Sequence, residues 1–271
     1  MSPSLEPVFA RLIDDAAIFP PGDAPLPDAV AAHAARTPED GAELVASFVL
    51  RDTDLPSVRG LEAPLSVVVT GGAGQLAGPA GLCGRLGLRL SALEIALRDL
   101  DDLAGNARRV VAAVDAARVE GVLDEDVPVF VELPQDDPGH SWLAAADEVA
   151  GAELRLKLRT GGVEAHHVPS SATLAAWIDA ALDRETPFKC TAGLHHAVRH
   201  DAGHGFLNVL AATRLAFDGG SREEVVATLE SRDAAALAAR DLTGVRRWFT
   251  SFGSCSVAEP WADLRELGLV A

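Results

Sequence analysis

Short apolar segments alternate along the chain with longer alanine-rich segments, and this alternation restricts the fold more than any other feature of the sequence. Most successive apolar segments begin about 20 to 35 residues apart, which leaves room for one helix and its loops. Strands separated by helices run parallel, because the crossover returns the chain to the same end of the sheet. The expected strands are residues 12–19, 44–50, 65–70, 90–97, 127–133, 154–158, 188–192 and 248–252.

The alanine-rich segments between these strands predict the helices. Asp101 and Asp102 precede one of them, and Ser170 and Ser171 stand at the start of another, where such side chains cap a helix. Helices are expected at residues 24–35, 100–119, 140–149, 171–183 and 223–239.

Eight strands and their helices in 271 residues predict a (β/α)8 barrel of the TIM type, with the active site at the C-terminal ends of the strands. We expect one domain over residues 1–271, with 193–247 as a loop and helical insertion at that face before the last strand. An open doubly wound sheet is the alternative. The barrel is favoured because no G-x-G-x-x-G fingerprint follows the first strand.

Charge and composition exclude several classes of partner. A formal net charge of −17 argues against nucleic acid, whose phosphates require a basic surface. No run of about 18 apolar residues is present to span a membrane. The first residues lack the pattern of a secretory signal, and the three cysteines are odd in number without metal-type spacing, so we expect a cytoplasmic protein. Abundant alanine and arginine are typical of GC-rich bacterial genomes.

Only two of the 23 lysine and arginine residues are lysines, and both end expected strands. Lys157 precedes Arg159-Thr-Gly-Gly, and Lys189 precedes Cys-Thr-Ala-Gly. A desolvated amine can lose its proton and attack a carbonyl, whereas a guanidinium effectively cannot. Where lysine is so rare, its presence at two strand ends before glycine turns indicates a chemical role.

Alternation along a strand places Lys157 and Arg159 on one face, and Lys189 and Thr191 likewise. Because neighbouring parallel strands lie about 4.8 Å apart, the two ammonium groups would repel each other and lower the pKa of one of them towards neutrality. The alternative is that the lysines form buried ion pairs with acidic residues of nearby strands. The acidic residues in question are Glu94 and Glu132.

Several segments, in order, resemble the class I Schiff-base aldolases of the deoxyribose-phosphate aldolase type. Lys157-Leu-Arg-Thr-Gly is similar to the strand that carries the family's imine-forming lysine, and Phe-Lys189-Cys-Thr-Ala-Gly to the strand with its second lysine. Leu-Ile-Asp-Asp15 resembles the family's opening strand, and Val-Phe-Val-Glu132 its Val-Ile-x-Glu strand. Gly-Ser254-Cys-Ser resembles the closing segment, which binds phosphate at a helix N-terminus.

The resemblance implies roles for individual residues. Lys157 would form the imine and Lys189 would lower its pKa, while Glu132 and Glu94 would transfer protons. Glu94 stands two residues beyond Ala92, the position that matches the family's proton-transferring aspartate. The expected substrate-binding residues are Arg159, Thr160, Thr191, Arg51, Asp15, His204, Asn208, Gly253, Ser254 and Ser256.

Half of the eight histidines lie in the segment that follows the second lysine, His195-His196-Ala-Val-Arg199-His200-Asp-Ala-Gly-His204. The family has a phosphate-binding loop there, so this departure argues against a sugar-phosphate substrate. The histidines could hold a metal together with a strand glutamate, bind an anion with Arg199, or act as general acid and base. They could also be surface residues without chemistry. We expect His195 and His196 to be catalytic.

The favoured hypothesis is an aldolase-like carbon–carbon lyase that acts on a small oxo acid or aldehyde through a lysine imine, without metal or cofactor. Its partner would be a small anionic or carbonyl metabolite, with no nucleic acid and no membrane, and the chain could form a homo-oligomer. One alternative is a metal-assisted lyase or isomerase with glutamate and histidine ligands. The other is a non-catalytic protein that binds an anionic metabolite.

Overall fold

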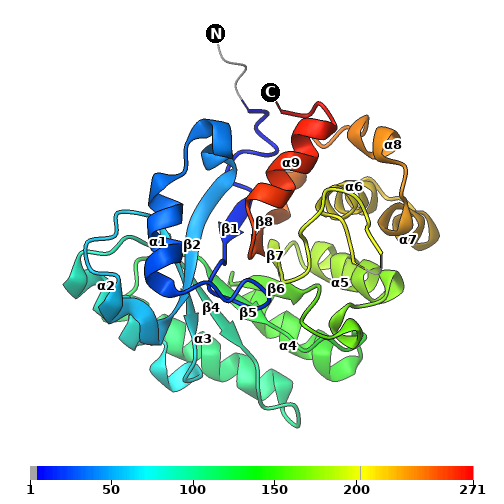
Figure 1. Cartoon of the computed structure of the whole chain (residues 1–271). Helices are drawn as coiled ribbons and strands as arrows, with labels where there is room; N and C mark the ends of the chain where they lie inside the picture. Colours follow the sequence, from blue (N-terminus) through cyan, green and yellow to red (C-terminus); the bar gives the residue numbers. More distant parts are fainter. Residues whose placement is uncertain (1–4, 202, 271) are drawn as a thin grey trace.

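Eight parallel strands close into a barrel in the order in which they occur in the sequence, and helices surround it (Figure 1). The computed structural model describes residues 5–201 and 203–270. The expected (β/α)8 fold is confirmed. The strands are β1 (Ile13–Asp15), β2 (Val45–Arg51), β3 (Leu65–Val69), β4 (Leu90–Ala96), β5 (Val129–Glu132), β6 (Arg155–Arg159), β7 (Phe188–Thr191) and β8 (Phe249–Ser254).

Each pair of neighbouring strands is joined by at least one α-helix or by short 3-10 turns. The α-helices are α1 (Leu26–Ala35), α2 (Ala77–Leu86), α3 (Leu103–Val119), α4 (His140–Gly151), α5 (Ser171–Asp183), α6 (Phe206–Phe217), α7 (Arg222–Glu230), α8 (Ala234–Ala238) and α9 (Ala258–Glu266). The 3-10 turns are Pro38–Asp40, Ala42–Leu44, Asp52–Ser57, Ala73–Gln75, Ala165–His167 and Val245–Arg247.

The expected helix caps are present. The Asp102 carboxylate accepts a hydrogen bond from the Gly105 amide at the start of α3, and the Ser170 hydroxyl accepts one from Thr173 at the start of α5. Both side chains satisfy backbone donors that have no partner within the helix. The sequence signals for these two helix starts were therefore reliable.

Helix α2 was not expected, because its sequence AGPAGLCGRL combines three glycines with a proline, all weak helix formers. It forms because packing stabilises it: Pro79, Ala80 and Cys83 are buried against the rest of the core. Helix α9 was missed as well. The single helix expected over residues 223–239 is interrupted, since Asp233 caps a separate helix α8.

The segment between β7 and β8 begins as a loop at the C-terminal end of β7 and continues into α6. Residues 206–213 of α6 are all buried, and the helix packs against α5, α7 and β8. The Phe206 ring stacks on Phe252 of β8 at a centroid distance of 5.1 Å. That residues 1–271 form one domain with this insertion at the active-site face stays a prediction.

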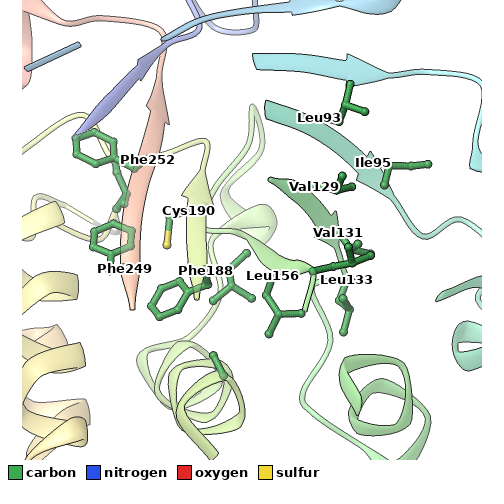
Figure 2. Close-up of a cluster of buried hydrophobic side chains, with 14 of the residues drawn as sticks. Leu93, Ile95, Val129, Val131, Leu133, Leu156, Phe188, Cys190, Phe249 and Phe252 are labelled. Atoms are coloured by element: carbon green, nitrogen blue, oxygen red, sulfur yellow. The ribbon is translucent and has the colours of Figure 1, made fainter. Parts of the chain in front are cut away.

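The core between strands and helices fixes which residues face the barrel interior. Side chains of β4 to β8, including Leu93, Ile95, Leu156 and Cys190, form a buried hydrophobic cluster between the strands and the helices around them (Figure 2). Because side chains alternate along a strand, the residues between them point inwards. The inward positions include Glu94 on β4, Lys157 on β6 and Lys189 on β7.

Candidate active site

Five charged side chains form a continuous row of ion pairs inside the barrel, which we call the ionic chain. The Lys189 ammonium lies 2.6 Å from an oxygen of Asp14 and 2.6 Å from one oxygen of Glu94. The other oxygen of Glu94 lies 2.8 Å from the Lys157 ammonium, which lies 2.9 Å from Glu132. One carboxylate thus bridges the two lysines, which stand opposite each other in the register of β6 and β7.

Three serine hydroxyls complete the hydrogen bonding of the two buried carboxylates. Ser47 and Ser251 each donate to a different oxygen of Asp14 at 2.6 Å. Ser66 donates to Glu94, also at 2.6 Å. Buried charges are tolerated when they are both paired and hydrogen-bonded, and these contacts meet both conditions.

The ion pairs correct the expectation of a neutral lysine. Burial alone would lower the pKa of Lys157, but the carboxylates of Glu94 and Glu132 outweigh it and raise that pKa above its usual range. The pKa of Lys189 is raised in the same way against burial, by Asp14 and Glu94. The like-charge repulsion on which the expectation depended is cancelled by the carboxylate placed between the amines. Both lysines are therefore ammonium ions at neutral pH.

The ionic chain is more open at one end. The Lys189 side chain is 2 % exposed, that of Lys157 8 % and that of Glu132 17 %. Lys189 also packs over the Phe130 ring, with its nitrogen 5.2 Å from the centroid. A molecule entering from the C-terminal ends of the strands would consequently meet Glu132 and Lys157 before Lys189.

The ionic chain makes stability depend on pH at both extremes. Burial would raise the pKa of Glu94, but the two lysines outweigh it and lower it, so the stabilisation is complete above the unfolded value of about 4.3 and is lost as the pH falls. The raised pKa of Lys157 has the opposite effect: its stabilisation is complete below about pH 10.4 and is lost at higher pH.

We therefore expect the free energy of unfolding, measured with urea, to be nearly constant from about pH 5 to about pH 10 as far as these groups are concerned. Below about pH 5, protonation of Glu94 alone should make the free energy of unfolding fall by up to about 1.4 kcal/mol per pH unit. In Glu94→Gln this contribution to the fall should be absent. An equally steep fall in that variant would contradict the ion pairing of Glu94.

Two arginines and two small residues stand at the C-terminal ends of the strands. Arg159 lies two residues beyond Lys157 on the same strand, and its guanidinium has no hydrogen bond or ion pair with any residue that the structure describes. The Arg51 guanidinium lies 4.6 Å from the centre of the Phe19 ring and 3.9 Å from Asp54. Thr191 ends β7 beside Gly253 of β8. These residues are placed as the sequence predicted, and their roles stay predictions.

The loops after the two lysine strands touch each other through their backbones. The Thr160 hydroxyl donates to the Ala192 carbonyl at 2.7 Å, and Thr160 is fully buried. A Cβ added to Gly161 would lie 2.8 Å from the Gly193 Cα, and Gly193 itself has a φ of +82°. Glycine is required at both positions, the second also for its left-handed backbone. Thr160 thus fixes the loops and is not available to a substrate.

Asp15 does not belong to the site, which corrects its assignment to substrate binding. It points outwards to α1, where it lies 2.9 Å from His33 and 3.3 Å from Arg36. Asp14, the preceding residue, faces the interior instead. The sequence Asp-Asp left the choice between the two open, because β1 is too short for its alternation to be evident.

His195 lies at the end of β8, outside the ionic chain. Its Nδ1 is 3.1 Å from Glu259 in the first turn of α9, and both ring nitrogens are 3.8 Å from the Cys255 sulfur. Ser254 is buried and donates to the Ser256 carbonyl at 2.7 Å. A glutamate therefore already stands in the helix turn where the resemblance implied phosphate, and the serines are bonded to one another.

The other predicted residues of the histidine segment make hydrogen bonds within the protein. His196 pairs with Asp263 of α9 at 3.2 Å and has no hydrogen bond with the ionic chain, and its catalytic role stays a prediction. His204 is buried and lies 2.8 Å from the Pro169 carbonyl and 3.1 Å from the Arg199 guanidinium. Burial lowers the pKa of His204, so it is a neutral link between two loops.

Asn208 is fully buried and bonded through every polar atom of its side chain. Its carbonyl oxygen accepts from the Arg199 amide at 2.8 Å, and its amide nitrogen donates to the carbonyls of Thr228 and Ser231 at 2.9 and 2.8 Å. Asn208 holds the histidine segment to α7. His204 and Asn208 are both bonded within the protein, and their role in substrate binding stays a prediction.

Within residues 5–201 and 203–270, no three histidine, cysteine, aspartate or glutamate side chains are grouped so as to hold a metal ion. The histidines that the metal hypothesis would use are paired with acids of α9, and the glutamates with lysines. The described residues thus offer no ligand set for the metal-assisted alternative.

Four buried polar residues of the site were given no role from the sequence: Asp14, Ser47, Ser66 and Ser251. Asp14 and Ser251 could be placed on barrel strands, whereas Ser47 and Ser66, each in a mainly apolar strand, were missed. A polar residue in an inward position of a barrel strand was the available signal. It was weak, because a single serine in a strand is common and its partner lies far away in the sequence.

Comparison with known proteins gives a likeness in structure only. No protein-family model matches the chain, and no curated protein sequence matches it significantly. The solved structure of a tetrameric deoxyribose phosphate aldolase from Aeropyrum pernix matches with a TM-score of 0.60 and 13% identity, over 96% of this chain and 92% of that chain. The resemblance to this type of aldolase is confirmed, and at this identity it shows the fold alone.

Among the helices that the structure describes, none has both the length and the apolar character needed to cross a membrane.

Proposed function

We propose that the protein is a carbon–carbon lyase of the aldolase type that forms an imine between Lys157 and a small oxo acid or aldehyde. The observation that carries the proposal is the pair of lysines bridged by Glu94, of which Lys157 is the one nearer the open end of the barrel. The fold shared with an aldolase supports it. Rings of polar residues at the C-terminal ends of barrel strands are where such enzymes react.

The Lys157 ammonium must lose a proton before it can react. The free amine then adds to the substrate carbonyl carbon, and the resulting carbinolamine takes up a proton and loses water to give an iminium ion. A base takes the proton of the hydroxyl on the β-carbon of the substrate, and the bond between the α- and β-carbons breaks. The β-carbon leaves as a carbonyl product, and the electron pair of the broken bond enters the iminium to form an enamine. Protonation of the enamine carbon and hydrolysis return the amine. Glu132, whose carboxylate lies 2.9 Å from the Lys157 nitrogen, would take the hydroxyl proton during bond cleavage and return a proton to the enamine carbon.

Arg159 supports an anionic substrate. Its guanidinium has no partner among the described residues, it belongs to the same strand face as Lys157, and a guanidinium matches a carboxylate in shape and charge. Because Lys157 and Arg159 are only two residues apart, the carbonyl and the carboxylate of the substrate would be close together. A short oxo acid fits this spacing best.

Borohydride trapping tests the imine. Incubation with a panel of short oxo acids and aldehydes, followed by reduction and peptide mass spectrometry, should place the adduct on Lys157, since Lys189, the one other lysine, is more deeply buried. Lys157→Arg keeps the charge and should reduce trapping by about a hundredfold or more, because a guanidinium does not form an imine. Absence of an adduct on Lys157 with every compound would refute the mechanism.

Glu132→Gln separates imine formation from turnover. Removing a carboxylate 2.9 Å from the ammonium should lower the pKa of Lys157 and so speed trapping near neutral pH, by about tenfold or more. The same variant should turn over its substrate more slowly, because the proton carrier is lost. Slower trapping together with slower turnover would contradict the role given to Glu132.

The second candidate is a barrel that binds an anionic metabolite without reacting. It is favoured by the Arg159 guanidinium, a positive charge at the end of β6 without a partner among the described residues. Under this proposal Lys157→Arg should bind the same anions about as tightly as the unaltered protein, with no turnover in either. The homo-oligomer expected from the sequence also stays a proposal, as the aldolase of similar fold is tetrameric.

A further inference from the structure

A polar cavity lies at the end of the barrel opposite to the candidate site, where the strands begin. Its volume is about 280 Å³, and its walls come from the segments that precede β1 and β4, the start of β2 and the end of α1. The polar residues that line it are Arg11, His33, Arg36, Ser47 and Arg89. We call it the basal cavity. It takes no part in the proposed function.

The basal cavity is positively charged in a chain whose net charge is −17. Within residues 5–201 and 203–270, Asp15 is the one carboxylate paired with these residues, at 2.9 Å from His33 and 3.3 Å from Arg36. The Arg11 guanidinium donates to the Ala46 carbonyl at 3.3 Å and has no ion pair with a described residue. Three guanidinium groups thus share a single acid, although carboxylates are plentiful in the chain.

Arg89 and Arg36 both have donors that nothing in the described protein satisfies. The Arg89 guanidinium, on an exposed residue, has no hydrogen bond or ion pair with residues 5–201 or 203–270. The Arg36 Nε–H is buried and has no acceptor there either. Because an unpaired buried donor is costly, nearly all such groups in folded proteins have a partner. An acceptor supplied from outside the chain would satisfy it.

We propose that the basal cavity is a binding site for a phosphate group. Arginines bind phosphate oxygens through paired N–H donors, and a dianion would balance the excess charge of the three guanidiniums. A volume of about 280 Å³ corresponds to about nine water molecules, enough for a phosphate and a short attached group. The oxygens would accept from Arg11, Arg36 and Arg89, with the Arg36 Nε–H among the donors.

The cavity also adjoins the ionic chain through one residue. Ser47 lines the cavity, and its hydroxyl donates to Asp14 at 2.6 Å. Phosphate would therefore be bound beneath the buried end of the ionic chain and away from Lys157.

Calorimetric titration with inorganic phosphate, at low and at moderate salt, tests the site. Arg89→Gln should weaken phosphate binding by about tenfold or more, because one of three charged donors is lost. Arg98→Gln is the matched control: Arg98 is also exposed and its guanidinium has no hydrogen bond or ion pair with a described residue, but it follows the opposite end of the same strand, β4. The control should change binding by less than about twofold, and added salt should weaken binding.

A second titration with glycerol phosphate distinguishes free phosphate from a phosphate ester, since the tighter ligand identifies the source. In both titrations the Arg36 Nε–H signal in NMR spectra should shift on binding, which an effect of net charge alone would not produce. Equal losses in Arg89→Gln and Arg98→Gln, no saturable binding of either compound, or an unchanged Arg36 signal would overturn the proposal. None of these results depends on imine formation, so failure here leaves the proposed function untouched.

Discussion

Glu94→Gln should lower the free energy of unfolding by about 3 to 5 kcal/mol near pH 7, the usual cost of removing one partner from a buried ion pair. Glu94 is 2 % exposed and is the one carboxylate that contacts both lysine ammonium groups. Glutamine keeps the size of the side chain but not its charge, so Lys157 and Lys189 would face each other with one carboxylate each. Urea unfolding followed by circular dichroism measures the loss.

The pH dependence of this loss identifies its cause. Without Glu94 the two ammonium groups repel each other, so one of them can release its proton as the pH rises. The difference in free energy of unfolding between the variant and the unaltered protein, which we call the deficit, should therefore become smaller between about pH 7 and pH 9. Glu120→Gln, the same change at an exposed residue without an ion pair, should cost less than about 0.5 kcal/mol. A deficit below about 1 kcal/mol for Glu94→Gln would mean that the ionic chain is not formed as described.

Lys189→Met should also cost about 3 to 5 kcal/mol, with the opposite dependence on pH. Methionine fills much of the same space, and the change leaves Asp14 with two serine hydroxyls but no cation. Protonation of Asp14 removes the buried negative charge that no longer has a cation beside it. The deficit should therefore narrow as the pH falls from about 7 to about 5, as measured by the same urea titrations.

The double variant Glu94→Gln, Lys189→Met provides the internal control. Because the two residues touch at 2.6 Å, the second change removes a charge that the first had left poorly paired. The combined loss should therefore be smaller than the sum of the two single losses, by about 1 to 3 kcal/mol. Additive losses would show that the two side chains act independently, contrary to the observed contact.

The fold could be predicted because its signals are local. Alternating apolar and alanine-rich segments, together with caps such as Asp102 and Ser170, indicate strands and helices over a few residues each. Helix α2 could not be found in this way, since its glycines and proline oppose a helix and only burial of residues such as Cys83 stabilises it. Tertiary packing overrides local preference there.

The site was predicted in part, for a related reason. Lys157, Lys189, Glu94 and Glu132 could be placed together, because strand alternation and barrel closure determine where they point. Their charge states could not, because these depend on which carboxylate stands between the amines at a distance of less than 3 Å. The partners of His195 and His196 on α9 could not be predicted either, since they are more than sixty residues away in the sequence.

The contact between Gly161 and Gly193 limits which substitutions are possible at the C-terminal ends of β6 and β7. The two backbones approach so closely that any larger residue at either position would push apart the strands that carry the lysines. Variants designed to accept bulkier compounds should therefore keep both glycines. The turn after β3 tolerates change better, because a Cβ added at Gly72 would have no atom within 4 Å. Gly72 has a φ of +76°, so residues are better inserted beside it than substituted for it.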